Sequence, residues 1–442
     1  MPLIRSISGL RATSGDGLLP CLIADYAAAF SAKQPHGEIV VGRDGRPSGN
    51  WIKNILIGTL TASGRKVRDL GIVPTPTVQL EVETTGAAGG IVITASHNPG
   101  EWNGLKFLDE TGVFLDKHQN EILWDILDNK KFSFCEDIKM PETETDDYAI
   151  DKHIQTIFKI PLFRDNYDFI KKIRDKKFKV VVDAVNAAGS LAIPKLLDKF
   201  GCEVVYLYCD ESGLFPHTPE PLPINLQELA ENVKLHKADL GIAVDPDADR
   251  LVLIDEKGEP VGEEKTIVMA AWAVFENLEL FSSYDKSAVI NFSSSKLLED
   301  LASGYGVKVE RSAVGEINVV KKMKEVNAVI GGEGSGGVIL PACHYGRDSL
   351  VGTALVLALL TQKNASLNEL SSRLPDYSMI KLKKEFSGDL EKLFRKIEDK
   401  YTEAEPVKLD GIKYVFNDSW IQIRASNTEP IIRIIAEAET IE

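Results

Sequence analysis

The chain has 442 residues, of which 44% are hydrophobic and 7% aromatic, so it carries enough apolar material for several domain cores. Lys and Arg together number 51 and Asp and Glu 66, which gives a formal net charge of −15. This acidic balance argues against a nucleic-acid-binding or membrane-surface protein, because both need a basic field, but it allows an anionic small-molecule substrate.

The five cysteines are too few and too scattered for a disulfide framework, and no His/Cys cluster has the spacing of a zinc site. The start, Met1–Arg5, lacks the apolar core of a signal peptide. The longest apolar stretches, Ile267–Phe275 and Leu350–Leu360, are much shorter than the roughly 20 residues that a membrane span needs. We therefore expect a soluble, cytoplasmic protein.

One pattern occurs three times along the chain: an apolar run, a loop, a helical stretch, a glycine and a second apolar run. The copies are Glu38 to Val67, Lys179 to Tyr208 and Ser287 to Val309. Each copy predicts a βαβ unit whose helix ends at a glycine (Gly64, Gly201 or Gly306). We therefore expect three consecutive mixed α/β domains of similar topology with largely parallel sheets, whether they arose by duplication or by convergence.

Composition also predicts where the domains end. The acidic stretch Met140–Asp147 is expected to be a connector before a helix near Tyr148–Phe158, and Asp255–Glu259 a turn before the third unit. After Leu374–Asp376, a charged helix and short strands ending in Ile431–Ala436 predict a C-terminal α+β domain with an antiparallel sheet. We expect domains at residues 1–145, 146–257, 258–370 and 371–442.

The loop after the apolar run Gly90–Ile93 reads Thr-Ala-Ser-His-Asn-Pro at residues 94–99. A loop that follows a strand in this way presents its hydroxyl at the sheet edge where α/β folds bind ligands, so Ser96 is a candidate nucleophile. His97 is not assumed to be its base, because successive residues of an extended chain point in opposite directions. A plain Asn-Pro turn explains the same residues, and these residues alone favour that interpretation.

The loop after Leu240–Val244 places three carboxylates, Asp245, Asp247 and Asp249, at alternating positions before Arg250. Such carboxylates repel one another unless a hard cation accepts their oxygens, so a metal site is favoured over a solvated turn. An EF-hand is excluded because Arg250 replaces the required glycine and a strand-like run follows. An aspartyl-phosphate nucleophile of the haloacid-dehalogenase type is disfavoured too, because Asp249 stands where that motif has Thr or Val. The set suits Mg²⁺ with a phosphate as a further ligand.

Two further loops are candidates for holding a sugar phosphate. Residues 331–337 read GGEGSGG after the run Ala328–Ile330, and Glu333 and Ser335 offer an acceptor and a hydroxyl to sugar hydroxyls. Such glycine-rich loops are more often simple turns. Residues 424–430 read RASNTEP, with Arg433 beyond, and this pattern fits a phosphate cradle and a polar turn about equally well.

Together and in this order, the four loops resemble those of the α-D-phosphohexomutase family, which includes phosphoglucomutase, phosphomannomutase and phosphoglucosamine mutase. TASHNP resembles the family's phosphoserine loop, DPDADR its metal loop, GGEGSGG its sugar loop and RASNTEP its phosphate loop. Further segments that resemble the family are SGLR at 8–11, GRDGR at 42–46 and NGLK at 103–106. The resemblance spans residues 8 to 433 and overturns the plain-turn interpretation of Ser96.

The resemblance implies four domains around a central cleft and an isomerase that acts as an intramolecular phosphotransferase. Phosphorylated Ser96 would donate its phosphate to a hexose monophosphate, giving a sugar 1,6-bisphosphate whose other phosphate returns to Ser96. Mg²⁺ would be held by the Ser96 phosphate together with Asp245, Asp247 and Asp249. The cations expected to balance the remaining charge are Arg11, Arg43, Lys106 and Arg250. The residues expected to contact the substrate are Glu333, Ser335, Arg347, Arg424, Ser426, Asn427, Thr428 and Arg433.

The general acid/base is harder to assign, because several relatives have a histidine where this chain has Gly337. His344 or Arg347 is a candidate to take that place. We expect Lys106 to be the acid/base, with burial beside arginines lowering its pKa, and His97 to be the second candidate.

The sugar loop, Arg311–Glu316 and Pro219–Pro223 most resemble a phosphoglucosamine-mutase-like branch. We therefore expect conversion of glucosamine 6-phosphate to glucosamine 1-phosphate, with phosphomannomutase/phosphoglucomutase activity as the alternative. A non-catalytic phosphosugar-binding protein on the same fold is the second alternative. We expect a hexose phosphate as the only class of partner, without nucleic acid or membrane, and a monomer or homodimer.

Overall fold

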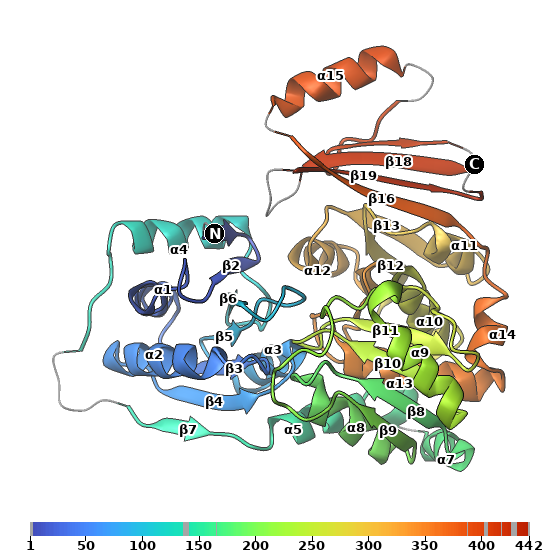
Figure 1. The fold of residues 1–442 in the computed structure, drawn as a ribbon, viewed down its shortest axis with the longest axis horizontal. Helices are drawn as coiled ribbons and strands as arrows, with labels where there is room; N and C mark the ends of the chain where they lie inside the picture. Colours follow the sequence, from blue (N-terminus) through green and yellow to red (C-terminus); the bar gives the residue numbers. More distant parts are fainter. Residues whose placement is uncertain are drawn as a thin grey trace.

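The computed structural model describes residues 3–135, 141–164, 166–386, 388–401, 405–416, 418–425 and 431–440. The described residues form four sheets that follow one another along the chain, from the blue N-terminal sheet to the red C-terminal one (Figure 1). Three are mixed sheets flanked by helices and the last is antiparallel with one helix beside it, so the expected fold class is confirmed.

The first sheet has the strand order β1-β2-β6-β5-β3-β4-β7. Its strands are β1 (Ile4–Ser6), β2 (Gly9–Thr13), β3 (Ile39–Arg43), β4 (Val67–Ile72), β5 (Gly89–Ile93), β6 (Trp102–Leu108) and β7 (Thr143–Thr145). Its helices are α1 (Pro20–Lys33), α2 (Gly49–Ala62), α3 (Thr75–Thr85) and α4 (Lys117–Asp128). Strands β5, β3, β4 and β7 run parallel, whereas β6, β2 and β1 add an antiparallel edge.

The second and third sheets share one plan: three parallel strands with an antiparallel fourth. The second has the order β11-β10-β8-β9, from β8 (Lys179–Asp183), β9 (Glu203–Leu207), β10 (Leu240–Val244) and β11 (Leu251–Asp255). The third has the order β13-β12-β14-β15, from β12 (Asp285–Asn291), β13 (Lys308–Ser312), β14 (Ala328–Glu333) and β15 (Gly337–Ile339).

Helices accompany each of these two sheets. Those of the second region are α5 (Ala149–Ile157), α6 (Pro161–Arg164), α7 (Tyr167–Lys176), α8 (Gly189–Lys199), the 3₁₀ turn η1 (Pro223–Asn225) and α9 (Gln227–His236). Those of the third are α10 (Glu263–Phe275), η2 (Leu278–Phe281), α11 (Leu297–Ser303), α12 (Glu316–Glu325), α13 (Ser349–Lys363) and α14 (Leu367–Ser371). Among the described residues, no helix is both long and apolar enough to cross a bilayer.

The three predicted βαβ units are confirmed, with parallel pairing of β3 with β4, β8 with β9 and β12 with β13. The glycines after their helices, Gly64, Gly201 and Gly306, all have positive φ. Only glycine adopts this left-handed backbone without a steric penalty, which is why a glycine marks the end of each helix in the sequence.

Two expectations about the connections were incomplete. Part of the acidic connector before α5 is the exposed strand β7, which pairs with β4 and forms one edge of the first sheet. In the C-terminal region the sequence analysis missed β16 (Ser378–Glu385), whose charged, mostly exposed residues lack the apolar signal of a core strand. This strand pairs with β19 (Ile431–Ala438), and β18 (Ser419–Ala425) and β17 (Ile412–Val415) complete the sheet beside α15 (Leu390–Lys400).

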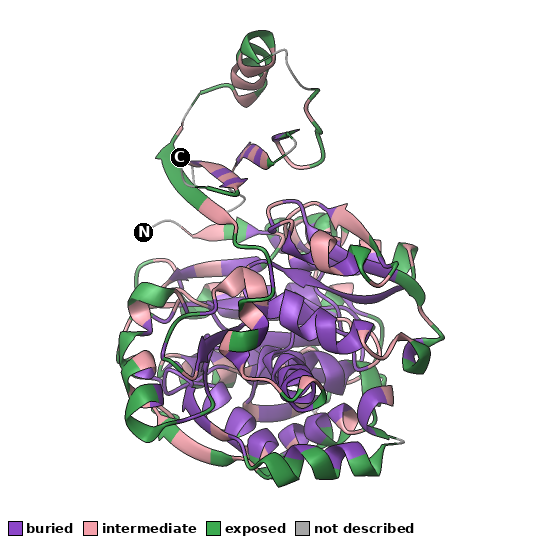
Figure 2. Cartoon of the chain, turned by 90° about the vertical axis from the view of Figure 1, so that its right-hand side faces the viewer, coloured by how far each residue is buried: buried purple, intermediate pink, exposed green. Residues whose placement is uncertain are grey.

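One hydrophobic core runs through parts of the first three regions and joins them into a single body. At its centre lies α13, whose residues from Ser349 to Thr361 are all buried and which contacts α5, α7, α8 and α10. Figure 2 shows this buried centre in purple. The C-terminal region projects from it, and none of the residues of α15 is buried.

The described C-terminal residues dock mainly on the third region. Lys413 of β17 is buried, donates to the carbonyl of Phe292 at 2.8 Å, and lies 3.5 Å from the centre of the Trp420 ring. Gln422 of β18 accepts from the Ser293 hydroxyl at 2.7 Å. These contacts fix one side of the C-terminal sheet against the loop after β12.

The central position of α13 predicts that a leucine-to-alanine substitution there lowers the stability of the protein much more than one on an exposed helix face. Leu355→Ala removes a fully buried side chain and is expected to lower the free energy of unfolding by about 2–5 kcal/mol. Leu235→Ala on α9, where the leucine is 75% exposed, should change it by less than about 0.5 kcal/mol. Urea denaturation followed by fluorescence measures both, and equal losses would contradict the central role of α13.

Lys413 predicts a pH-dependent stability. Burial lowers the pKa of Lys413 to about 7 from 10.5, so the unfolded chain binds the additional proton between these values. The free energy of unfolding should therefore rise as pH increases from about 7 to about 10. The melting temperature, measured against pH, reports this rise in stability, and the rise should be smaller in Lys413→Met. The same pH dependence in the variant and the wild type would refute the prediction.

Candidate active site

Ser96 lies in the loop that follows β5, and its backbone is held in an unusual conformation. The residue has a φ of 50°, in the left-handed region that non-glycine residues rarely adopt. Its N–H donates to Thr94 Oγ1 at 2.8 Å, and the buried Arg46 donates to its carbonyl oxygen at 2.8 Å. These contacts aim the side chain out of the first sheet, where Ser96 Oγ donates to Asp245 Oδ2 at 2.9 Å.

The turn between β10 and β11 carries the three aspartates that the sequence analysis singled out. Asp245, Asp247 and Asp249 are fully buried, and one oxygen of each lies within 4.8 Å of the others. Two of their oxygens, Asp247 Oδ1 and Asp249 Oδ1, have no hydrogen-bond partner among the described residues. A buried carboxylate oxygen without a partner is costly, and oxygens of this kind are ligands of hard divalent cations. The arrangement therefore fits a metal site.

Cationic side chains from the first and third regions close around these carboxylates. Lys106 Nζ on β6 lies 2.7 Å from Asp247 Oδ2 and 3.2 Å from Asp249 Oδ2. Arg347, in the loop before α13, reaches Asp249 Oδ2 at 2.7 Å. Arg250 is more distant, with Nε 3.9 Å from oxygens of both Asp245 and Asp249. Positive charges from the first, second and third regions therefore surround the three aspartates.

The pKa directions in the cluster follow from this packing. Burial and the neighbouring carboxylates of Asp249 and Asp247 raise the pKa of Asp245 well above its usual value. Burial also disfavours ionised Asp249, but the charges of Arg347 and Lys106 outweigh it and lower the pKa of that carboxyl. Asp245 is therefore the member that most needs a further positive charge in order to ionise.

The expectation that burial lowers the pKa of Lys106 was wrong. Burial does act in that direction, but the carboxylates of Asp247 and Asp249 outweigh it, and the pKa of Lys106 is raised. Lys106 is therefore protonated at neutral pH. Sequence analysis placed arginines beside it and did not place the two carboxylates in direct contact.

The second acid/base candidate, His97, lies next to Ser96, with Nδ1 3.4 Å from Ser96 Oγ. Burial, reinforced by the charges of Arg250 and Arg11, lowers the pKa of His97 well below its usual value. Arg11 itself donates to Asn98 Oδ1 at 2.9 Å, and burial lowers its pKa to about 10. His97 is therefore neutral at pH 7.

The glycine-rich loop reaches the same centre through Glu333, the last residue of β14. Its carboxylate accepts from Arg347 Nη1 at 2.7 Å and from Asn291 Nδ2 at 2.8 Å. Ser335 lies in the following turn, where the Gly336 carbonyl accepts from the N–H of Leu251 at 2.9 Å. A side chain at Gly336 would approach the Leu251 carbonyl to 2.5 Å, so glycine allows the sugar loop to lie directly against the metal loop.

Of the predicted phosphate loop, Arg424 and Arg433 are described, whereas Ser426, Asn427 and Thr428 lie outside the described residues. Arg424 and Arg433 are directly opposite each other on β18 and β19. Burial and the facing Arg433 lower the pKa of Arg424, although the carboxylates of Asp410 and Glu333 oppose this shift. Two arginines therefore stand opposite each other in the sheet, and the negative charge of Glu333 in the sugar loop acts on Arg424.

Sequence analysis missed several residues that support the centre. Thr75 at the start of α3 donates through its hydroxyl to Asp247 Oδ2 at 2.7 Å. Glu316 at the start of α12 accepts from Arg347 Nε at 3.0 Å. Glu316 belongs to a segment that resembles the family, but no local pattern indicates the role of either residue, because the two contacts span 172 and 31 positions of the chain. His344, proposed as a replacement acid/base, instead points to Asp348 and away from this set.

Comparison with known families places every region of the chain in one group. The descriptions that match are those of phosphoglucomutase/phosphomannomutase alpha/beta/alpha domains I, II and III, at residues 7–134, 152–258 and 263–377. The C-terminal domain of the same family matches residues 382–442.

Similar full-length proteins carry two kinds of name. A phosphoglucomutase/phosphomannomutase of Thermococcus kodakarensis is 38% identical, covering 98% of this chain and 94% of its own length. A phosphoglucosamine/phosphogalactosamine mutase of Sulfurisphaera tokodaii is 34% identical with the same coverage. Among solved structures, a phosphoglucomutase/phosphomannomutase family protein of Burkholderia thailandensis superposes with a TM-score of 0.82 at 26% identity, covering 99% of this chain and 93% of that one.

The unpartnered carboxylate oxygens predict divalent-cation binding that depends on Asp247. Asp247→Asn removes one charge from the cluster and is expected to weaken Mn²⁺ or Mg²⁺ binding at least tenfold, measured by isothermal titration. The matched control is Asp255→Asn, a buried aspartate that pairs with Leu240 at the opposite end of β10. If the Asp247 variant bound the cation as tightly as the wild type, or if the control lost as much affinity, the carboxylate cluster would not be the cation site.

Proposed function

The chain belongs to the phosphoglucomutase/phosphomannomutase family, and from this premise we propose that it is a phosphohexomutase that acts on glucosamine phosphate. It interconverts the 6-phosphate and 1-phosphate of the sugar through a phosphorylated serine and a bisphosphorylated intermediate. The hydrogen bond of 2.9 Å between Ser96 Oγ and Asp245 Oδ2 carries this proposal, because it joins the candidate nucleophile to the candidate metal site. The contact links residues 149 positions apart, which supports a shared site.

Each turnover requires two transfers at Ser96. In the first, the phosphoryl group leaves Ser96 Oγ and bonds to the free sugar hydroxyl, whose proton is passed on so that Ser96 becomes a hydroxyl again; in the second, Ser96 Oγ gives up that proton. The resulting 1,6-bisphosphate reverses its orientation in the site, and its other phosphate returns to Ser96 Oγ. The sugar oxygen that loses this phosphate takes up a proton, so charge and atoms balance over the cycle.

The three aspartates and a phosphate on Ser96 would bring together about five negative charges, counting roughly two for the phosphate. We propose Mg²⁺ as the cation that the Ser96 phosphate and Asp245, Asp247 and Asp249 hold, and it supplies Lewis-acid stabilisation of the transferring group. Lys106 stays protonated and donates hydrogen bonds at this centre. Arg11 and Arg250 add positive charge next to the same oxygens.

The proton chemistry we propose divides between Lys106 and His97. Lys106 is protonated and contacts Asp247, so it can donate a proton or hydrogen bond to an oxygen that leaves. His97 is neutral, and its Nδ1 lies 3.4 Å from Ser96 Oγ, so it can accept one. Distances in the absence of substrate are often longer than in the reacting complex.

Two features support an amino sugar as the preferred substrate. Glu333, Glu316 and Asp249 all contact Arg347, so three carboxylates share one guanidinium here, and Arg424 adds a second positive charge near Glu333. The surplus negative charge suits the ammonium group of glucosamine, and the S. tokodaii relative carries an amino-sugar name. Phosphomannomutase/phosphoglucomutase activity is the alternative, and the name of the T. kodakarensis relative favours it. A non-catalytic phosphosugar-binding role is the second alternative.

Arg424 and Arg433 are proposed to bind the phosphate that is not reacting, together with Ser426, Asn427 and Thr428. Ser335 and Glu333 are proposed to contact sugar hydroxyls in either orientation of the bisphosphate. The effect of the Glu333 charge on Arg424 supports a site shared by the third and C-terminal regions.

The nucleophile is tested by Ser96→Ala. This variant should lose the mass of the phosphate in intact-mass spectrometry and lower kcat at least a thousandfold, while sugar-phosphate affinity changes little. The control, Ser190→Ala, removes another buried serine hydroxyl and should leave the phosphate mass and turnover intact. Turnover at the original rate without Ser96 would disprove the phosphoserine mechanism, whereas a wild-type protein that binds sugar phosphates without turnover would have only the phosphosugar-binding role.

The substrate is tested by Glu333→Gln. Loss of this carboxylate should lower kcat/KM for glucosamine phosphates about tenfold or more, because one charge-assisted contact of about 1.4 kcal/mol disappears. Glucose and mannose phosphates should be affected less, because their neutral hydroxyl makes a weaker hydrogen bond to the carboxylate than the ammonium group does. All three sugars are assayed side by side, with Ser335→Ala as the variant that perturbs the loop without changing charge. Equal losses for all three would contradict recognition of an amino group by Glu333.

A further inference from the structure

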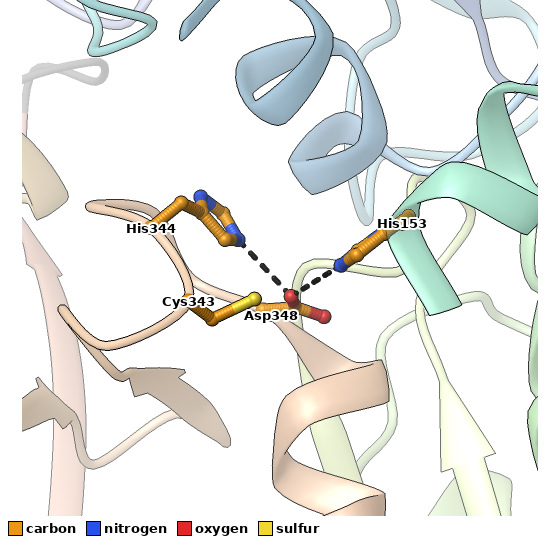
Figure 3. Close-up of side chains that lie close together, drawn as sticks. All are labelled: His153, Cys343, His344 and Asp348. Carbon is orange, nitrogen blue, oxygen red and sulfur yellow. Dashed lines mark hydrogen bonds and ion pairs between the residues drawn. The ribbon is translucent and has the colours of Figure 1, made fainter. Parts of the chain in front are cut away.

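A second group of side chains that could bind a metal ion lies outside the candidate active site. It consists of His153, Cys343, His344 and Asp348 (Figure 3). His153 comes from α5, and the other three come from the loop that leads into α13. All four residues are buried, and one ligand atom from each lies within 4.8 Å of the others. The sequence analysis found no zinc spacing because 195 positions separate His153 from Asp348.

The contacts within this cluster converge on one atom. His153 Nε2 and His344 Nε2 lie 2.8 Å and 3.0 Å from Asp348 Oδ2, and the Cys343 sulfur points toward the same carboxylate (Figure 3). The other oxygen, Asp348 Oδ1, accepts from the N–H groups of Leu350 and Val351 at 2.8 Å and 3.2 Å. Asp348 is therefore fixed as the cap of α13, and only Oδ2 remains free to act as a ligand.

One of the two imidazoles, His153, is oriented as metal ligands usually are. His153 Nδ1 is 2.9 Å from the hydroxyl of Thr77 on α3, a second contact that fixes the ring and leaves Nε2 for the centre. His344 Nδ1 is buried without a hydrogen-bond partner among the described residues. The His344 ring is therefore held through Nε2 alone.

We propose that these four residues form a zinc site, distinct from the aspartate cluster. Tetrahedral zinc takes imidazole nitrogens at about 2.0–2.1 Å and thiolate sulfur at about 2.3 Å, so small side-chain movements bring all four atoms into range. Two neutral imidazoles, one carboxylate and one thiolate carry a charge of −2, which Zn²⁺ cancels. On binding, zinc replaces the thiol proton of Cys343, and that proton passes to solvent. The soft sulfur and the imidazoles select zinc over Mg²⁺.

The site would tie three parts of the fold together. Thr77 belongs to the first region and His153 to the second, while Cys343, His344 and Asp348 belong to the third. Asp348 directly follows Arg347, which contacts Asp249 and Glu333 in the candidate active site. Zinc at this position would therefore stabilise the packing of the Arg347 loop against α5.

The experiment uses the full chain with saturating Mg²⁺, so that the aspartate cluster is occupied. The protein is loaded with Zn²⁺, dialysed and analysed for metal. A second sample is loaded with Co²⁺, whose thiolate complex absorbs visibly in a tetrahedral site. We expect roughly one zinc per chain and a thiolate-to-cobalt band. Zinc at background level, or cobalt binding without the thiolate band, would overturn the proposal and leave a metal-free His–Asp–His hydrogen-bonded cluster.

Variants assign the ligands. Cys343→Ser should abolish the thiolate band, and His153→Gln should lower zinc content at least fivefold. Cys202→Ser, which removes a partly buried thiol elsewhere, should change neither. Asp247→Asn should keep its zinc, which separates this site from the aspartate cluster. Retained zinc and an unchanged band in Cys343→Ser would overturn the proposal, and the wild-type cobalt spectrum decides the matter if a variant does not fold.

Discussion

The structure depends above all on how three buried carboxylates are neutralised. Asp245, Asp247 and Asp249 lie within 4.8 Å of one another with no exposure to solvent, so their mutual repulsion is weakly screened. Their counter-charges come from the first and third regions, through Lys106 and Arg347. The cost of burying charge is thus offset only when separate regions of the chain are assembled. This constraint ties the assembly of the first three regions to the candidate active site.

The same constraint explains why the supporting loops are rigid and closely packed. Ala248 in the aspartate turn and Ser96 in the facing loop both have left-handed backbone, and each is fixed by contacts from another element. Gly336 brings the sugar loop against Leu251, the first residue of β11. A phosphate transferred at the proposed site would be held by groups whose positions are set before the sugar binds, which would reduce the reorganisation that transfer requires.

Much of this arrangement follows from local sequence. The βαβ units were predictable because their strands are continuous apolar runs and their helices end at glycines with positive φ. The candidate site loops were found because Ser96, the aspartates and Glu333 each follow a strong strand signal. Family resemblance then connected them, which no pattern in the chain itself could do. The four domain boundaries stay a prediction.

What the sequence did not reveal depends on distant contacts or on weak local signals. Strand β16 has the charged composition of an exposed edge, and β7 is exposed throughout. The raised pKa of Lys106 depends on two aspartates 141 and 143 positions away. The group of His153 and Asp348 likewise forms only when α5 packs beside the start of α13. In each case tertiary packing, and not local pattern, decides the chemistry.

The central claim is that Ser96 and the three aspartates share one cation during phosphoryl transfer. Anomalous diffraction from crystals grown with Mn²⁺ and glucosamine 1,6-bisphosphate tests it most directly. We expect a single strong manganese peak within bonding distance of Ser96 and the carboxylates of Asp245, Asp247 and Asp249. A manganese peak elsewhere, with Lys106 still seated on Asp247 and Asp249 and no density between Ser96 and the aspartates, would contradict it.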